Sequence, residues 1–120
     1  MLLFSAFIPG RPPSKKNTKK FFRGRVIYSK QFREWEKIAL TILKPEKMID
    51  EAINAKFTFH FKNRQAEADV SNLIEAPQDA LQKANVISDD RLIHVVIGKK
   101  VFDGTEGTKI ELFTSEEFNL

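Results

Sequence analysis

Apolar and polar residues alternate most clearly along residues 53–61. Five apolar residues share one face and four polar residues share the other, namely Ile53, Ala55, Phe57, Phe59 and Phe61 against Asn54, Lys56, Thr58 and His60. A period of two residues predicts a strand with one buried face. On this pattern we interpret His60 as a strand residue on the solvent side and not as a metal ligand. His94, in another apolar stretch, is interpreted in the same way.

Two other stretches place their apolar residues at helical spacing. In the first, Ser29 is the predicted N-cap of a helix that runs to about Leu43. In the second, the apolar stripe continues from Leu73 onward and includes Pro77. Because proline removes a backbone hydrogen bond inside a helix, we predict that this helix begins around Leu73 or Ile74, or is kinked at Pro77.

Shorter apolar runs predict four further strands, and a basic loop lies between the first two of them. The strands are expected at residues 2–8, 26–28, 92–101 and 108–113, and the loop at 14–25. The order strand, hairpin, helix, strand, helix, strand, strand predicts an α+β fold, a small mixed or antiparallel twisted sheet with two helices covering one face. The 120 residues, of which 42% are hydrophobic and eleven are Phe, are expected to form one domain, residues 1–120.

The absence of cysteine limits the ligands that a metal ion could have, and the shortness of the apolar N-terminus limits what that segment could be. Without thiolates, a bound metal ion would have oxygen or imidazole ligands, which favours a hard ion such as Mg²⁺ or Mn²⁺. The first eight residues are apolar, but no charged flank precedes them and they are too few to span a membrane. We therefore predict a buried strand at this end and no membrane partner.

Positive charge is concentrated at the N-terminal end. Residues 1–33 hold nine Lys or Arg and no acidic residue, whereas residues 34–120 hold eleven basic and sixteen acidic residues. A basic segment beside an acidic remainder is typical of a protein that binds a polyanion, although a merely solvated loop is the alternative. The predicted nucleic-acid contacts are Lys15, Lys16, Asn17, Lys19, Lys20, Arg23 and Arg25. Phe21 and Phe22 either stack on or wedge between bases, or anchor the loop to the core.

Negative charge gathers within residues 67–90. The six carboxylates belong to Glu67, Asp69, Glu75, Asp79, Asp89 and Asp90. Carboxylates that folding brings together repel one another unless one is protonated or a cation is bound. Taken singly, Asp69 and Asn72 are explained as helix caps, Glu75 by the helix dipole, and Asp89 and Asp90 by a turn. Taken together with the basic segment, they predict a metal-dependent phosphodiesterase, provided that the Asp89–Asp90 loop folds back to the start of the helix.

The order of these residues resembles a known family. The segment Asp69-x-Ser71-Asn72-Leu73, followed by Asp79-Ala80-Leu81 and Asp89-Asp90, is similar to the active-site stretch of the RusA family of Holliday-junction resolvases. Pro12-Pro13-Ser14, Asn17, Arg23-Gly24-Arg25 and Ser29 are similar to that family's opening loop. The resemblance implies a RusA-like fold and a homodimer that makes paired symmetric nicks in four-way DNA junctions. It further implies dependence on Mg²⁺, for which Mn²⁺ can substitute, no nucleotide cofactor, and a place in the cytoplasm of a bacterial or phage-infected cell.

The resemblance also assigns site residues, with two departures. The family's aspartates map onto Asp69, position 71 and Asp90, but position 71 is Ser, and the family's catalytic lysine maps onto Glu75. Because residue 75 follows residue 71 by four, we interpret Glu75 as returning the carboxylate that Ser71 lacks. The predicted catalytic and metal-binding residues are Asp69, Glu75 and Asp90, assisted by Asp89 and Asp79. The lysine's role would pass to Lys62, Arg64 or the basic segment.

Two other functions remain open on the sequence. The first is a non-catalytic nucleic-acid-binding module with a degenerate active site, in which the carboxylates are structural. The second is an enzyme that uses the carboxylates as general acid and base without a metal ion.

Overall fold

Four strands form one mixed sheet in a computed structural model that describes residues 1–14, 19–64 and 68–116. Their order across the sheet is β1 (Leu2–Pro9), β6 (Gly107–Thr114), β4 (Ile53–His60) and β5 (Ile93–Val101). β6 pairs antiparallel with both β1 and β4, whereas β4 and β5 are parallel. β5 therefore lies at one edge of the sheet and β1 at the other.

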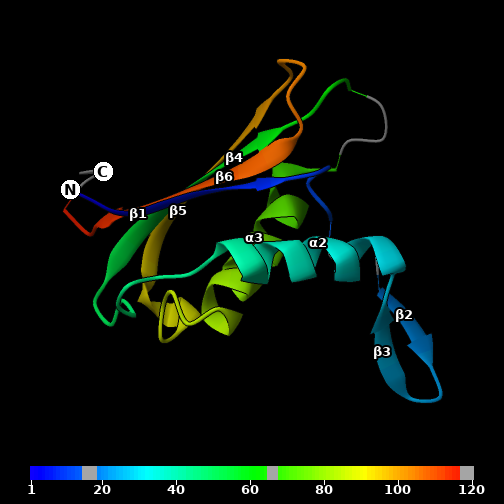
Figure 1. The fold of residues 1–120 in the computed structure, drawn as a ribbon, viewed down its shortest axis with the longest axis horizontal. Coiled ribbons are helices and arrows are strands. Elements are labelled where there is room, and N and C mark those ends of the chain that lie inside the picture. Colours follow the sequence, from blue (N-terminus) through cyan, green and yellow to red (C-terminus); the bar gives the residue numbers. More distant parts are fainter. Residues whose placement is uncertain (15–18, 65–67, 117–120) are drawn as a thin grey trace.

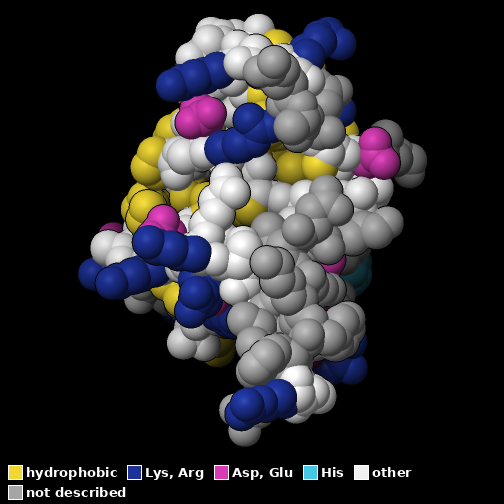
Figure 2. Space-filling model, turned by 90° about the vertical axis from the view of Figure 1, so that its right-hand side faces the viewer, with side chains coloured by type: hydrophobic (Ala, Val, Ile, Leu, Met, Phe, Trp, Pro, Cys, Tyr) yellow, Lys and Arg dark blue, Asp and Glu magenta, His cyan; other side chains and the backbone are white. Residues whose placement is uncertain are grey.

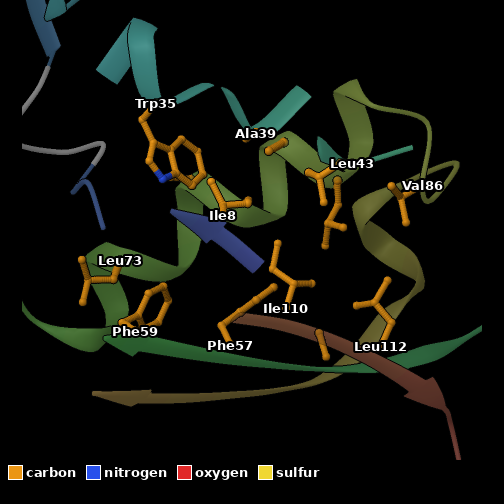
Figure 3. Close-up of a cluster of buried hydrophobic side chains, with 14 of the residues drawn as sticks. Ile8, Trp35, Ala39, Leu43, Phe57, Phe59, Leu73, Val86, Ile110 and Leu112 are labelled. Atoms are coloured by element: carbon orange, nitrogen blue, oxygen red, sulfur yellow. The ribbon is translucent and has the colours of Figure 1, made fainter. Parts of the chain in front are cut away.

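Both long helices, α2 (Lys30–Ile42) and α3 (Val70–Lys83), cover the same face of the sheet (Figure 1). Leu43, the C-cap residue of α2, lies on the side of Ile110, and Leu73 of α3 lies beside Phe59 (Figure 3). The predicted α+β class is therefore confirmed. In the described part of the chain, no helix is long and apolar enough to cross a membrane.

The predicted strand at residues 53–61 is confirmed as β4. Phe57 and Phe59 face the helices and are buried. His60 lies on the opposite face, where its Nδ1 is 3.1 Å from Oδ2 of Asp103. The prediction that His60 is a strand residue on the face away from the core is confirmed.

The helix boundaries confirm one prediction and correct another. The Ser29 hydroxyl accepts a hydrogen bond from the backbone N–H of Phe32 at 3.2 Å, as expected of an N-cap. α3, however, begins at Val70, so the predicted start around Leu73 is wrong and Pro77 lies inside the helix. Pro77 is buried with the rest of the apolar face of α3, and this packing offsets the backbone bond that it removes.

The segment predicted as a basic loop contains a hairpin. Strands β2 (Lys19–Phe22) and β3 (Arg25–Tyr28) pair antiparallel through a turn at Arg23 and Gly24, whose φ angles are 50° and 75°. Two-residue turns with positive φ suit the twist of a hairpin, which explains a glycine at this point. The hairpin stands away from the main sheet, beyond the first turn of α2 (Figure 1).

Candidate active site

The outward face of α3 carries acidic and polar residues along its length. Asp69 occupies the N-cap position of α3, which confirms its interpretation as a helix cap, although its carboxylate makes no capping hydrogen bond. Ser71 is exposed, and Glu75 and Asp79 are half-buried. Since helical side chains lean toward the N-terminus, the Glu75 side chain extends over the turn that holds Ser71. This placement is consistent with the interpretation that Glu75 supplies the carboxylate missing at Ser71.

Asp89 and Asp90 lie beyond the other end of α3. The Asp89 carboxylate accepts hydrogen bonds from the Arg91 backbone N–H at 2.8 Å and from Arg91 Nε and Nη2 at 3.1 and 2.9 Å. The Arg91 side chain, and next its backbone N–H, lower the pKa of Asp89 from 3.8 to about 2. Asp89 thus shapes the turn that begins the short 3₁₀ helix η1 (Asp90–Leu92), which confirms its structural interpretation.

Replacing Arg91 with Gln is expected to raise the pKa of Asp89 from about 2 part of the way to 3.8. The rise is partial because the backbone N–H of residue 91 still donates to the carboxylate. An NMR pH titration of the Asp89 carboxyl carbon measures it, with Arg33→Gln on the exposed side of α2 as the matched control. A pKa unchanged in the Arg91 variant would contradict the guanidinium as the main cause.

The two groups of carboxylates stay apart within one chain. The backbone N–H of Asp90 donates to Oε1 of Gln82 at 3.3 Å, which places Asp90 beside the C-terminal end of α3. A helix rises about 1.5 Å per residue, so Asp69 and Gln82 are separated by about 20 Å. The loop therefore does not fold back to the start of α3 as expected. Among the residues that the structure describes, no three or more Asp, Glu or His side chains lie close enough to hold a metal ion. These residues of a single chain do not by themselves fit a divalent metal ion.

Two arginines are held on aromatic rings at the C-terminal ends of β4 and β5. The rings of Phe61 and Phe102 are stacked, with centroids 5.9 Å apart. The guanidinium carbon of Arg11 lies 5.7 Å from the Phe61 centroid, and that of Arg64 lies 4.5 Å from the Phe102 centroid. Such cation–π contacts position a guanidinium group, whose planar set of N–H donors suits phosphate oxygens.

Lys100 brings a third cation to the same end of the sheet. Its Nζ donates to the carbonyl of Ala68 at 3.3 Å, next to Asp69. We call Arg11, Arg64 and Lys100 the basic cluster. Lys100 lies at the N-terminal end of α3, where the helix dipole also favours an anion.

The structure places the predicted nucleic-acid contacts only in part. Lys15, Lys16 and Asn17 lie outside the described residues, and so do the side chains of Lys19, Lys20, Phe21, Phe22 and Arg25. Arg23 is exposed at the tip of the hairpin. Figure 2 views the molecule from the hairpin side and shows Lys and Arg side chains spread from end to end of this face, with few Asp and Glu among them.

Sequence reasoning missed one member of the basic cluster, Lys100, and did not single out Arg11 from the rest of the basic segment. It assigned the lysine's role to Lys62, Arg64 or the basic segment, but not to Lys100. No sequence signal marks Lys100, because lysine is ordinary in an edge strand. Arg11 was counted with the N-terminal charge, and only the Phe61 contact distinguishes it.

Carboxylates beside cations that can bind phosphate are typical of enzymes that process nucleic acids. The model of the family described as endodeoxyribonuclease RusA matches residues 9–113. The chain therefore belongs to the RusA family, which confirms the resemblance and implies the nuclease activity of a Holliday-junction resolvase. RusA resolvases generally depend on a divalent metal ion. A comparison with curated proteins found no significant match.

Proposed function

We propose that this protein is a Mg²⁺-dependent, structure-selective endonuclease that resolves four-way DNA junctions by paired symmetric nicks. It acts as a homodimer in the cytoplasm of a bacterial or phage-infected cell, and Mn²⁺ can replace Mg²⁺. Residues 1–120 form one nuclease domain. The observation that carries this proposal is the match of the RusA endodeoxyribonuclease family over residues 9–113.

The basic cluster and the hairpin bind the DNA backbone in this proposal. Arg11, Arg64 and Lys100 contact phosphates, with Lys100 at the N-terminal end of α3, next to Asp69. The hairpin, with Arg23 at its tip, extends this positive surface away from the sheet. Junction affinity therefore falls steeply as salt is raised, since each phosphate contact releases counterions. The remaining contacts are Lys15, Lys16, Asn17, Lys19, Lys20 and Arg25, with Phe21 or Phe22 as the wedge at the junction centre.

The catalytic carboxylates in this proposal are Asp69, Glu75 and Asp90, with Asp89 and Asp79 assisting. The Asp69 carboxylate makes no capping hydrogen bond, and side chains on a helix lean toward its N-terminus, which for Glu75 is the turn that holds Ser71. Both features support a pair of catalytic acids at the start of α3. The Asp89 carboxylate already accepts hydrogen bonds from Arg91, whereas Asp90 is exposed. Of the two, Asp90 is therefore the more accessible ligand for a metal ion.

A cleavage assay tests the proposal against its rivals. The protein is incubated with a synthetic four-way junction or a linear duplex of matched sequence, in Mg²⁺ or in EDTA. We expect nicks at symmetric positions of two strands, in the junction alone and in Mg²⁺ alone. Junction binding without cleavage in Mg²⁺ or Mn²⁺ would favour the non-catalytic module, and cleavage that persists in EDTA would favour metal-free acid–base chemistry.

A further inference from the structure

We infer that the face of the sheet away from the helices is a second nucleic-acid surface, which binds single-stranded DNA. A base of the strand stacks on the ring of Phe7, and the ammonium groups of Lys99 and Lys109 contact its phosphates. The inference goes beyond the proposed junction cleavage, because this binding requires neither the catalytic carboxylates nor a metal ion.

This face of the sheet, called the open face below, is not covered by either long helix. Both α2 and α3 pack on the other face, and Figure 1 shows no helix of the described chain over this one. Thr58 lies between buried Phe57 and Phe59 in β4, so its side chain points to the open face. Its register partners on the two neighbouring strands, Lys109 of β6 and Lys99 of β5, point the same way.

The Phe7 ring lies over Gly107 on the open face. A Cβ at Gly107 would collide with Cζ of Phe7, so glycine makes room for the ring. The His60 ring packs against Phe7 in a T-shaped arrangement, with centroids 6.1 Å apart, and is itself held by its 3.1 Å contact with Asp103. Phe7 is nevertheless 41% exposed. A positioned and exposed aromatic ring is a surface on which a base of a single strand can stack.

Two exposed lysines lie beside this ring. Lys109 is the register partner of both Phe7 and Thr58, and Lys99 pairs with Thr58 from the other side. Neighbouring strands lie about 4.8 Å apart, so the backbones of Lys99 and Lys109 are about 10 Å apart. Neither ammonium group makes a hydrogen bond or an ion pair with a residue that the structure describes. Both are therefore available to phosphate oxygens.

Charge and the exposed ring together favour single-stranded DNA as the ligand. Along the four strands of the sheet, the only acidic residue on the open face is Glu111, which lies opposite Lys56 in the register. This leaves the charges of Lys99 and Lys109 uncompensated. Bases inside a duplex are stacked on one another, whereas the bases of a single strand can stack on an aromatic side chain. The chain belongs to a family of endodeoxyribonucleases, which favours DNA as the strand.

The open face continues into the basic cluster around the C-terminal ends of β4 and β5. Lys99 points to the open face, whereas Lys100, the next residue, belongs to the basic cluster. His60 likewise lies on the open face, whereas the ring of Phe61 contacts Arg11 of the cluster. A single strand that leaves the basic cluster can therefore pass around this end of the sheet to reach Phe7.

The salt dependence of single-strand binding tests the two lysines. Fluorescence anisotropy of a labelled oligothymidylate is recorded in EDTA over a series of salt concentrations. Lys99→Gln/Lys109→Gln should weaken binding and reduce the slope of log K against log salt by about 1.4, because each phosphate contact to a single strand contributes about 0.7. The control Lys44→Gln/Lys47→Gln removes the same charge from exposed positions after α2 and should keep the wild-type slope. Equal slopes for the two double variants would overturn the inference.

Two substitutions of Phe7 test base stacking. Phe7→Leu removes the ring but keeps an apolar side chain over Gly107, and should weaken binding of the oligothymidylate at least about fivefold. Phe7→Tyr keeps an aromatic ring and should bind within about twofold of the wild-type protein. Circular dichroism verifies that both variants are folded. Equal affinities of the two folded variants would overturn the stacking of a base on Phe7.

A gel-shift titration with a blunt-ended four-way junction separates the open face from the junction-binding surface. Lys99→Gln/Lys109→Gln should bind this junction within about twofold of the wild-type protein, since the substrate has no single-stranded segment. An equal loss of junction binding and of single-strand binding would place both lysines in the junction-binding surface and overturn the inference of a second one. All of these measurements are made in EDTA, so their outcome does not depend on whether the protein cleaves junctions.

Discussion

Replacing Glu75 with Gln is expected to lower junction nicking by at least about 100-fold, because an amide removes a carboxylate charge from the reacting site. Junction binding is expected to change by less than about twofold, since the phosphate contacts are made by cations elsewhere on the surface. Single-turnover cleavage and a gel-shift titration on the same four-way junction measure the two effects separately. The expectation rests on the position of Glu75, half-buried one turn after Ser71 on the outward face of α3.

Two matched variants make this prediction sharper. Glu51→Gln removes the same charge from an exposed position before β4 and should leave cleavage unchanged. Glu75→Lys should be inactive, whereas the double variant Ser71→Asp/Glu75→Lys rebuilds the pattern of the commoner family members and should regain cleavage. Full cleavage by Glu75→Gln would mean that Glu75 does not supply the carboxylate that Ser71 lacks.

Replacing Phe57 with Ala is expected to lower the free energy of unfolding by about 3–5 kcal/mol. Phe57 is fully buried at the centre of the sheet, between Ile110 of β6 and Gly98 of β5 in the register of the strands. Its loss leaves a cavity beneath both helices, and the predicted cost is a large share of the roughly 5–15 kcal/mol that stabilises an ordinary domain. Urea denaturation followed by circular dichroism measures the change.

Phe7→Ala provides the matched control for Phe57→Ala. Phe7 is 41% exposed and lies on the face of the sheet away from the helices. Its truncation should cost less than about 1.5 kcal/mol, because much of its surface already contacts water. Equal losses for the two variants would show that burial by the helices is not what stabilises the sheet.

Local sequence patterns predicted the strands and helices in which buried residues recur at a regular spacing. The alternation at Ile53–Phe61 and the cap at Ser29 were both confirmed, because one-sided burial and capping depend on neighbours in sequence. The start of α3 was predicted wrongly. Pro77 is unfavourable in a helix by itself, and only its packing in the assembled core offsets that cost.

The hairpin shows a similar limit of local patterns. Lys19–Phe22 is short and basic, which resembles a loop when the pairing partner is unknown. Its strand conformation depends on the turn at Arg23 and Gly24 and on the register with Arg25–Tyr28.

The residues that could carry this protein's chemistry can be recognised without a structure. The carboxylates within residues 67–90, the basic N-terminal segment and the RusA pattern can all be recognised in the sequence, because residue type and spacing carry them. Which of these groups lie close together depends on the fold. An α-helix rises about 1.5 Å per residue, so α3 places Asp69 about 20 Å from Gln82, and Asp90 lies beside Gln82. Strand order sets Lys100 beside Asp69 and leaves β5 at an edge, because position in a sheet depends on pairing between residues far apart in sequence.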